Sequence, residues 1–298
     1  MRVHPLDLLY VSRKFAEVAL VVTGCGGDRR VYAFRERARE GLVVVASDAV
    51  LKPVKAVGDF FAMSLDTFVL MFRPPFAWRE LLLQSWFVAR VSILPTLLLT
   101  IPFTVLVVFT LNILLIELGA ADFSGTGAAT TSVTQIGPVV TVLVIAGAGA
   151  TAMCADLGAR TIREEIDALR VLGINPVQAL VVPRVLAATI VAAALVSVVT
   201  VVGLAGSFFF SVFVQHVTPG AFAAGLTLLT GLSDVLVGVV KGALFGMAAA
   251  LIACYKGMSV GGGPQGVGNA VNETVVYAFM ALFLINIIAT AVTFVGPQ

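Results

Sequence analysis

The feature that most constrains this chain is the length of its stretches without a charged side chain. The run from Val185 to Ser233 contains no Asp, Glu, Lys or Arg, and no Lys or Arg occurs between Val91 and Ala159. A soluble domain needs polar and charged side chains to cover its core. Here 59% of the residues are hydrophobic, only 12% are charged, and the mean hydropathy is +1.03. The sequence therefore predicts an integral membrane protein.

The apolar runs predict an all-α protein with five membrane spans. A helix needs about 20 apolar residues to cross a bilayer. The run after Val185 is too long for one crossing, and the polar sequence QHVTPG at 215–220 divides it. Pro95 and Pro102 lie inside the first span, where they are expected to kink or loosen the helix. The predicted spans are residues 93–116, 135–157, 181–213, 234–255 and 272–295.

Two segments precede the first span. Residues 1–48 are predicted to be a cytoplasmic extension in which no chemistry is evident. Residues 54–90 are amphipathic: Val57, Phe61 and Leu65 recur at helical spacing, but charged residues are too frequent for a span. Such helices typically lie on a membrane surface, and the alternative is an ordinary helix packed on another domain.

The basic residues predict the orientation in the membrane. Of the 19 Lys and Arg, thirteen lie at or before Arg90 and four lie in the 158–184 connection, whereas the 117–134 and 214–232 connections contain none. Lys and Arg accumulate on the cytoplasmic side of a membrane. We therefore expect a cytoplasmic N-terminus and, after five crossings, a C-terminus on the outside.

The 158–184 connection contains a short charged sequence, REEIDALRVLGINP. It predicts a cytoplasmic helix at residues 162–172. Thr161 and Glu164 match a capping box at its start, and Gly173 is suited to the left-handed residue that ends a helix. Arg163 is expected to pair with Asp167 one turn later.

Two interpretations of this helix remain open from the residues alone. It is either a solvated connector or a docking helix for a cytoplasmic partner. In the second case Ile166, Leu169 and Leu172 provide an apolar stripe for a groove. The acidic side chains Glu164 and Glu165 would then face basic residues of the partner.

Small residues recur within two of the predicted spans. Gly238, Gly242 and Gly246 are spaced four apart in the fourth span, and Gly147 begins a similar row in the second. Small side chains let helices approach closely inside a membrane. The rows predict helix packing, either within this chain or against a second membrane chain.

Asp234 and Lys241 are the charged residues of the fourth span. They are seven residues apart, which places them on one face and about 10 Å apart along the axis. Lys241 lies too deep to reach the membrane surface, so it needs a partner or water. The two residues form either a structural pair in the bundle or a site for headgroup contact or conformational coupling.

No cofactor or metal motif is evident. The cysteines Cys25, Cys154 and Cys254 have no zinc or disulfide spacing, and two histidines are too few for a metal site. GGGPQGVG at 261–268 contains a formal G-x-G-x-x-G, but it joins two spans and lacks the G-K-[ST] of a phosphate loop. We therefore expect a non-catalytic chain that binds no metal, nucleotide or nucleic acid.

Several segments resemble the MlaE/YrbE permease family of ABC transporters, whose members work with MCE-domain proteins on lipids. The resemblance spans about residues 50–298 and is closest to the A-type YrbE permeases of actinobacterial Mce systems. The segments that carry it are RPPFAWRELLLQ (73–84), FTLNILLIELGAAD (109–122), QIGPVVTVLVIAGAGATAMCADLGARTIREEIDALRVLGINPVQALVVPRVLA (135–187) and NETVVYAFMALF (272–283).

The resemblance implies a permease domain at residues 49–298 in a plasma membrane. It implies a cytoplasmic ATPase that holds ATP and Mg, a second YrbE-type permease with a lipid cavity between the two chains, and MCE-domain proteins outside. Import of a lipid or fatty acid is the expected direction. Residues 162–172 become the coupling helix. Its ATPase-coupling residues are then Arg163, Glu164, Glu165, Asp167, Leu169, Leu172 and Gly173.

The same resemblance suggests candidates for the lipid cavity. These are Phe103, Leu106 and Phe109 on the first span, for which core packing or lipid exposure is an equal explanation, and Gln135, which stands where many family members carry an acid. Two rival functions remain. One is an ATP-independent secondary transporter that uses Asp234 and Lys241, and the other is a structural membrane anchor of a complex.

Overall fold

The computed structural model describes residues 55–74, 77–120, 123–215, 217–226 and 231–295. The chain divides into two compact units, residues 1–59 and residues 60–298. Of the first unit only residues 55–59 are described, so the predicted extension at 1–48 lies outside the described residues. The account below concerns the second unit, in which the described residues form helices and no strand.

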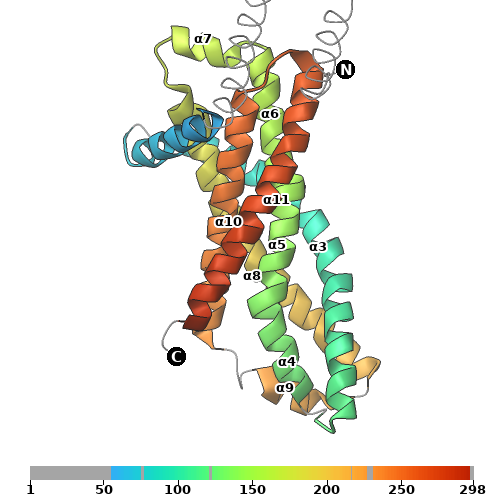
Figure 1. Ribbon diagram of the computed structural model, residues 1–298. Coiled ribbons are helices and arrows are strands. Elements are labelled where there is room, and N and C mark those ends of the chain that lie inside the picture. The colour runs from blue at the N-terminus through green and yellow to red at the C-terminus, as the bar shows by residue number, and fades with distance from the viewer. Residues whose placement is uncertain (1–54, 75–76, 121–122, 216, 227–230, 296–298) are drawn as a thin grey trace, which may run out of the picture. The chain divides into compact units, whose positions relative to one another are not determined.

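Five helical stretches are long and apolar enough to cross a membrane, as the sequence predicted. They run side by side in Figure 1. The first is α3 (Trp78–Glu117), the third comprises a π-helical turn, η4 (Val177–Val181), and α8 (Val182–Phe213), and the last two are α10 (Leu232–Met258) and α11 (Gly263–Val295). Two short helices accompany them, α7 (Glu165–Val171) and α9 (Pro219–Leu226).

The second stretch is one helix with two π-helical turns. Its parts are α4 (Ser124–Thr131), η2 (Ser132–Ile136), α5 (Gly137–Val144), η3 (Ile145–Gly149) and α6 (Ala150–Ile162).

All five helical stretches begin before their predicted spans, and two of these early starts bring the helix against another helix. The predicted second span starts at residue 135, but the helix starts at Ser124. The added part, α4, packs closely on α9, and the Thr126 hydroxyl donates to the Gly225 carbonyl at 2.9 Å. The glycine-rich sequence at 261–268, which joins the last two spans and was expected to be a loop, is helical from Gly263 onward. There α11 has begun, and Val267 packs over Gly158 of α6.

The amphipathic segment at 54–90 is divided between two helices. Residues 55–71 form one helix and residues 78–90 belong to α3, while residues 54, 75 and 76 lie outside the described residues. From Phe60 onward, the first of these helices lies across the spans in Figure 1, with Met63 buried and the Phe60 ring against Tyr255 at 5.6 Å. Phe61 and Leu65 are exposed on its other side, as a helix on a membrane surface requires.

Prolines do not interrupt α3, which continues through Pro95 and Pro102. A row of buried hydroxyls faces α8 instead: Thr96, Thr100 and Thr104 each donate to the carbonyl four residues earlier, at 2.6 to 2.7 Å. These bonds satisfy the hydroxyl groups within the helix itself. Polar side chains can therefore lie between two spans without water.

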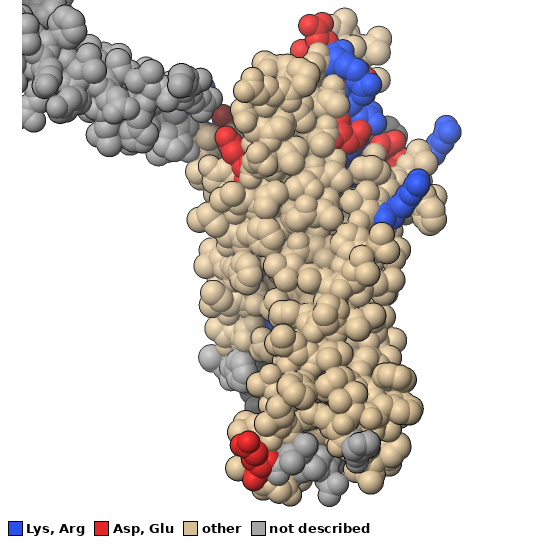
Figure 2. All heavy atoms as spheres, turned by 90° about the vertical axis from the view of Figure 1, so that its right-hand side faces the viewer, with Lys and Arg blue, Asp and Glu red and all other residues tan. Residues whose placement is uncertain are grey.

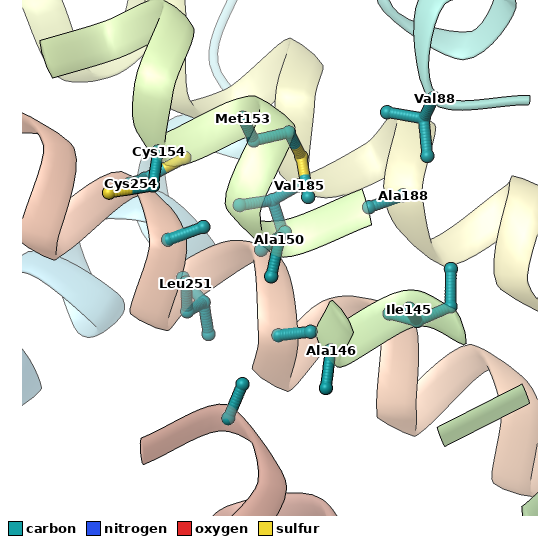
Figure 3. Close-up of a cluster of buried hydrophobic side chains, with 14 of the residues drawn as sticks. Val88, Ile145, Ala146, Ala150, Met153, Cys154, Val185, Ala188, Leu251 and Cys254 are labelled. Carbon is teal, nitrogen blue, oxygen red and sulfur yellow. The ribbon is translucent and has the colours of Figure 1, made fainter. Parts of the chain in front are cut away.

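The core lies where α6, α8 and α10 meet, and small side chains are frequent among its larger apolar ones. Figure 3 shows Ala146 and Ala150 on the second stretch, Ala188 on α8 and Cys254 on α10 around one buried cluster. Gly242 and Gly246 face α8, and a Cβ on Gly246 would lie 2.3 Å from the Ala188 carbonyl oxygen. The glycine row of the fourth span thus packs within this chain.

The two ends of the bundle differ in charge. The face drawn in Figure 2 shows basic and acidic side chains together at one end, a broad band of uncharged side chains below them, and acidic side chains at the other end. The charged end is the one that carries α7 and the C-terminal end of α10 in Figure 1. This distribution matches the pattern from which the sequence predicts the cytoplasmic side.

We predict that Gly246→Ala lowers the free energy of unfolding by about 1–3 kcal/mol, because the new methyl group meets backbone atoms that cannot move aside. Gly238→Ala is the matched control in the same helix. Its Cβ would be 3.5 Å or more from its nearest neighbours, and helix propensity favours Ala over Gly. Thermal unfolding of the purified protein in detergent measures both, and equal stability of the two variants would contradict this packing.

Candidate functional site

The charged helix α7 is shorter than predicted and begins differently. It spans Glu165–Val171 rather than 162–172, because α6 continues to Ile162 and the chain then turns sharply. Glu164 forms the turn with φ of 59°, and it is the one non-glycine residue in the described part of the chain with positive φ. The left-handed conformation costs such a residue about 1–2 kcal/mol.

The predicted capping box is wrong. The hydroxyl of Thr161 belongs to α6 and donates to the carbonyls of Leu157 and Gly257, at 2.9 and 3.0 Å. The second bond joins the end of α6 to the end of α10. A contact far along the chain has therefore replaced the local cap that the sequence pattern suggested.

The end of α7 agrees with the prediction. Gly173 is left-handed, with φ of 77°. Its N–H donates to the Arg170 carbonyl and the N–H of Ile174 donates to the Leu169 carbonyl, both at 3.0 Å. These two bonds form a Schellman motif, which fixes the direction in which the chain leaves α7.

The apolar residues of α7 are divided between the core and the surface. Ile166 is only 4% exposed, and Leu169 packs partly against the same core cluster. Leu172 points outward with 72% exposure, beside Val171 at 88% and the exposed Ile174. Of the predicted apolar stripe, Leu172 alone is free for a partner, and Val171 and Ile174 were missed because helical spacing alone did not show which side α7 buries.

The charges around α7 are also arranged differently from the prediction. Arg163 pairs with Glu165 at 3.1 Å, and Asp167 pairs with Arg170 at 2.8 Å, so the expected Arg163–Asp167 pair is absent. Glu164 is exposed, and no ion pair to it is found among the described residues. We call Glu164, at the start of α7, and the exposed apolar trio Val171, Leu172 and Ile174, at its C-terminal end, the outward surface of α7.

A second candidate region lies along the second helical stretch, most of which is buried. One row of side chains spaced four residues apart stays exposed or half-buried from one end to the other. We call it the open row. Its members are Thr131, Gln135, Val139, Leu143, Gly147 and Thr151.

Two apolar grooves lie between α3 and the open row. The groove of about 390 Å³ is lined by Leu98, Leu143 and Gly147 among others, and the groove of about 690 Å³ is lined by Leu106 of α3 and by Thr131. A Cβ on Gly147 would meet nothing within 4 Å. Gly147 therefore does not pack inside this chain, unlike the glycines of α10.

The cavity candidates do not all reach these grooves. Leu106 and Gln135 are exposed, and Leu106 lines the larger groove. Phe103 is half-buried against a core cluster, and the Phe109 ring packs edge-on against Phe210 at 5.7 Å. Position on α3 alone did not distinguish these environments.

Asp234 and Lys241 do not form the pair that was one interpretation of the sequence. Asp234 lies in the first turn of α10, where its carboxylate accepts a bond from the Gly231 N–H at 2.9 Å. Lys241 is 5% exposed, and its Nζ donates to the Thr290 hydroxyl of α11 at 3.1 Å. One residue caps a helix, and the other joins two spans.

Within the described residues, no group of three His, Cys, Asp or Glu side chains is close enough to hold a metal. The glycine-rich sequence at 261–268 leads directly into α11 and follows α10 rather than a strand. It therefore lacks the strand–loop–helix arrangement that binds a dinucleotide.

Comparison with known proteins explains this architecture. The family model described as Permease MlaE matches residues 81–292, which include all of α7 and the open row. The chain belongs to the MlaE permease family. It is thus a transporter membrane subunit.

Individual relatives agree with this assignment. A probable ABC transporter permease of Synechocystis is 33% identical over 54% of this chain and 62% of its own length. A probable ABC transporter permease of Rickettsia typhi is 28% identical over 82% of this chain and 94% of its own length. The chloroplast protein TRIGALACTOSYLDIACYLGLYCEROL 1 of Arabidopsis thaliana is 29% identical over 54% of this chain and 46% of its own length.

We predict that Glu164→Gly stabilises this MlaE permease by about 1 kcal/mol, because glycine adopts the left-handed conformation without the steric cost that Glu164 bears. Glu164→Ile should destabilise it, since a β-branched residue is disfavoured there. Thermal unfolding in detergent tests both variants. If the isoleucine variant were as stable as the glycine variant, the turn between α6 and α7 would differ from the one described.

Proposed function

We propose that this chain is the membrane subunit of an ABC transporter that moves lipids, and that α7 is the coupling helix on which a separate ATPase docks. The observation that carries the proposal is the outward surface of α7. Three exposed apolar side chains follow one another at the C-terminal end of α7, and Glu164, to which no ion pair is found among the described residues, precedes its first residue, while the other side of the helix is anchored in the core. Exposed apolar groups beside a charge are typical of a protein interface.

A lipid is the proposed substrate because the smaller groove is lined by apolar residues alone, and the larger groove is mainly apolar, with Thr110, Glu117 and Thr131 as its polar lining. They provide few groups to replace the water around a polar solute. The name of the Arabidopsis relative contains that of a galactolipid. A second permease chain is proposed to face the open row and close the lipid cavity.

The remaining parts of the proposal follow the resemblance to YrbE permeases of Mce systems. MCE-domain proteins would receive or deliver the lipid outside a plasma membrane, and import is the proposed direction. The N-terminus would be cytoplasmic. The partner ATPase would hold ATP and Mg, while this chain contributes the passage and the docking surface.

The mechanism follows from how α7 is held. When the ATPase pair closes on ATP, the outward surface of α7 moves with it. Because Ile166 is buried in the core and the Schellman motif fixes the exit at Gly173, α7 does not swing independently. Its displacement reaches the inner ends of the spans and changes the space beside the open row.

The alternative function, an ATP-independent secondary transporter, is not supported by any specific contact among the described residues. A secondary transporter was expected to use Asp234 and Lys241 together. Asp234 instead caps α10, and Lys241 binds Thr290. The two are separate, and we do not propose ion-coupled transport.

Affinity purification of the full chain from its native membranes tests the docking surface, with mass spectrometry of the proteins that accompany it. We expect an ATPase with the wild type and at least a tenfold loss of it with Val171→Asp/Leu172→Asp, since each buried apolar side chain contributes about 1.5–3 kcal/mol. Leu118→Asp is the control, because Leu118 is equally exposed but lies just after α3, at the opposite end of the bundle.

Recovery of the ATPase with the Val171→Asp/Leu172→Asp variant would show that α7 is a connector. Absence of any ATPase from the wild-type preparation would remove the basis of the ABC proposal. Loss of the ATPase with Leu118→Asp as well would point to general misfolding rather than to docking.

A separate prediction concerns the grooves. Gly147→Trp places a large ring in the groove of about 390 Å³ without meeting protein atoms near its Cβ, so we expect unchanged thermal stability and several-fold less lipid recovered with the purified complex. Gly206→Trp is the control, because a Cβ at this position in α8 also meets nothing within 4 Å. Lipid extraction with mass spectrometry measures both, and equal recovery would exclude the groove from the passage.

A further inference from the structure

A fully buried arginine lies at the charged end of the bundle. Arg184, in the first turn of α8, is 0% exposed. Its Nη2 donates to Asp156 Oδ2 of α6 at 2.5 Å, and its Nη1 donates to the Leu180 carbonyl of η4 at 2.9 Å. The guanidinium group therefore joins α8 to α6 and also holds the chain that leads from α7 into α8.

Further charged groups continue from this pair to α7. Arg160 Nε lies 3.5 Å from Asp156, and Arg160 Nη1 lies 3.9 Å from Glu165 Oε2. Glu165 also pairs with Arg163. Arg184, Asp156, Arg160 and Glu165 thus form a row of alternating charge across α8, α6 and α7, which we call the ionic ladder.

The ladder provides a second route from α7 to α8 beside the covalent one. Residues 172–175, which connect α7 to η4, are all exposed. By contrast, α6 is firmly fixed to α10 by the bond from Thr161 to the Gly257 carbonyl and by close packing at Gly257. Without the ladder, a displacement of α7 would reach α6 directly and α8 only through this exposed connection and apolar contacts.

The choice of residue types also needs an explanation. A buried ion pair is often no more stabilising than apolar side chains of the same size, because both charges lose their water. The Arg184–Asp156 pair, in which Arg184 is fully buried and the Asp156 side chain is 30% exposed, is therefore weak evidence for stability alone. A directional, charge-assisted connection between helices is what it adds.

We propose that the ionic ladder joins the coupling helix α7 to the inner end of α8, so that a displacement of α7 is transmitted to the third span as well as to the second. This inference rests on the proposed function, because α7 is taken to be the coupling helix. Its test does not need an ATPase and is independent of that function. Arg160 is the critical member, because it is the ladder residue that contacts both Asp156 and Glu165. Arg184 acts through Asp156 and is a positioning residue.

Hydrogen–deuterium exchange of the α7 amides in the purified full-length protein, in lipid nanodiscs, tests the ladder without any ATPase. Arg160→Met cuts the ladder and leaves the buried pair intact. We expect the α7 amides to exchange about threefold to tenfold faster, as the loss of two partly exposed ion pairs implies. Lys256→Met is the matched control, because it removes a 2.8 Å ion pair to Glu273 that joins α10 to α11.

A second variant addresses the buried end. Asp156→Leu/Arg184→Met removes both charges together, so no unpaired charge remains in the core, and thermal unfolding verifies that it folds. We expect the same acceleration in α7 as with Arg160→Met, although neither changed residue lies in α7. Combining all three changes should add little more, because members of one network are not additive.

Unchanged exchange in α7 with Arg160→Met, or full additivity of the two cuts, would overturn the ladder. Equal acceleration with Lys256→Met would overturn it too, since the effect would then be a general loosening. If the ladder variants behave as expected but no ATPase accompanies the wild-type chain, the proposed function fails and the mechanical connection stands.

Discussion

The close approach of α8 and α10 is the contact on which the rest of the bundle depends. Gly242 and Gly246 bring α10 against the backbone of α8, and α6, α11 and α3 pack around that pair. In a membrane the apolar faces gain nothing by leaving lipid, so helices associate through van der Waals packing and internal hydrogen bonds. The small side chains at the contact of α8 and α10 therefore let the two helices pack closely enough for such contacts.

This packing separates two regions with different tasks. The charged end holds α7 through Ile166 and the ionic ladder, and its exposed surface is chemically mixed. The region beside the open row is apolar and only partly filled by this chain. A transporter subunit needs both regions. A firmly held surface transmits the motion of a partner, and a loosely filled region can change shape as the substrate passes.

The sequence predicted the five spans well because hydropathy over some 20 residues averages out local detail. It failed where the outcome depended on a distant contact. The start at Ser124 depends on Gly225, and the bond from Thr161 to Gly257 replaced the expected cap. The rows at Gly147 and Gly246 look alike in sequence, yet Gly246 packs within the chain and Gly147 faces outward. Only tertiary structure distinguishes them.

The two π-helical turns, η2 and η3, have a geometric consequence for the open row. In an α-helix each residue advances the rotation by about 100°, so a row spaced four residues apart drifts by about 40° a step. Over the five steps from Thr131 to Thr151 the drift would be about 200°, which would carry the row around to the buried side. Each π-helical turn holds one extra residue and takes back about 100°. The two π-helical turns therefore return the open row to the same side of the second span, whereas in an uninterrupted α-helix the row would wind around the axis.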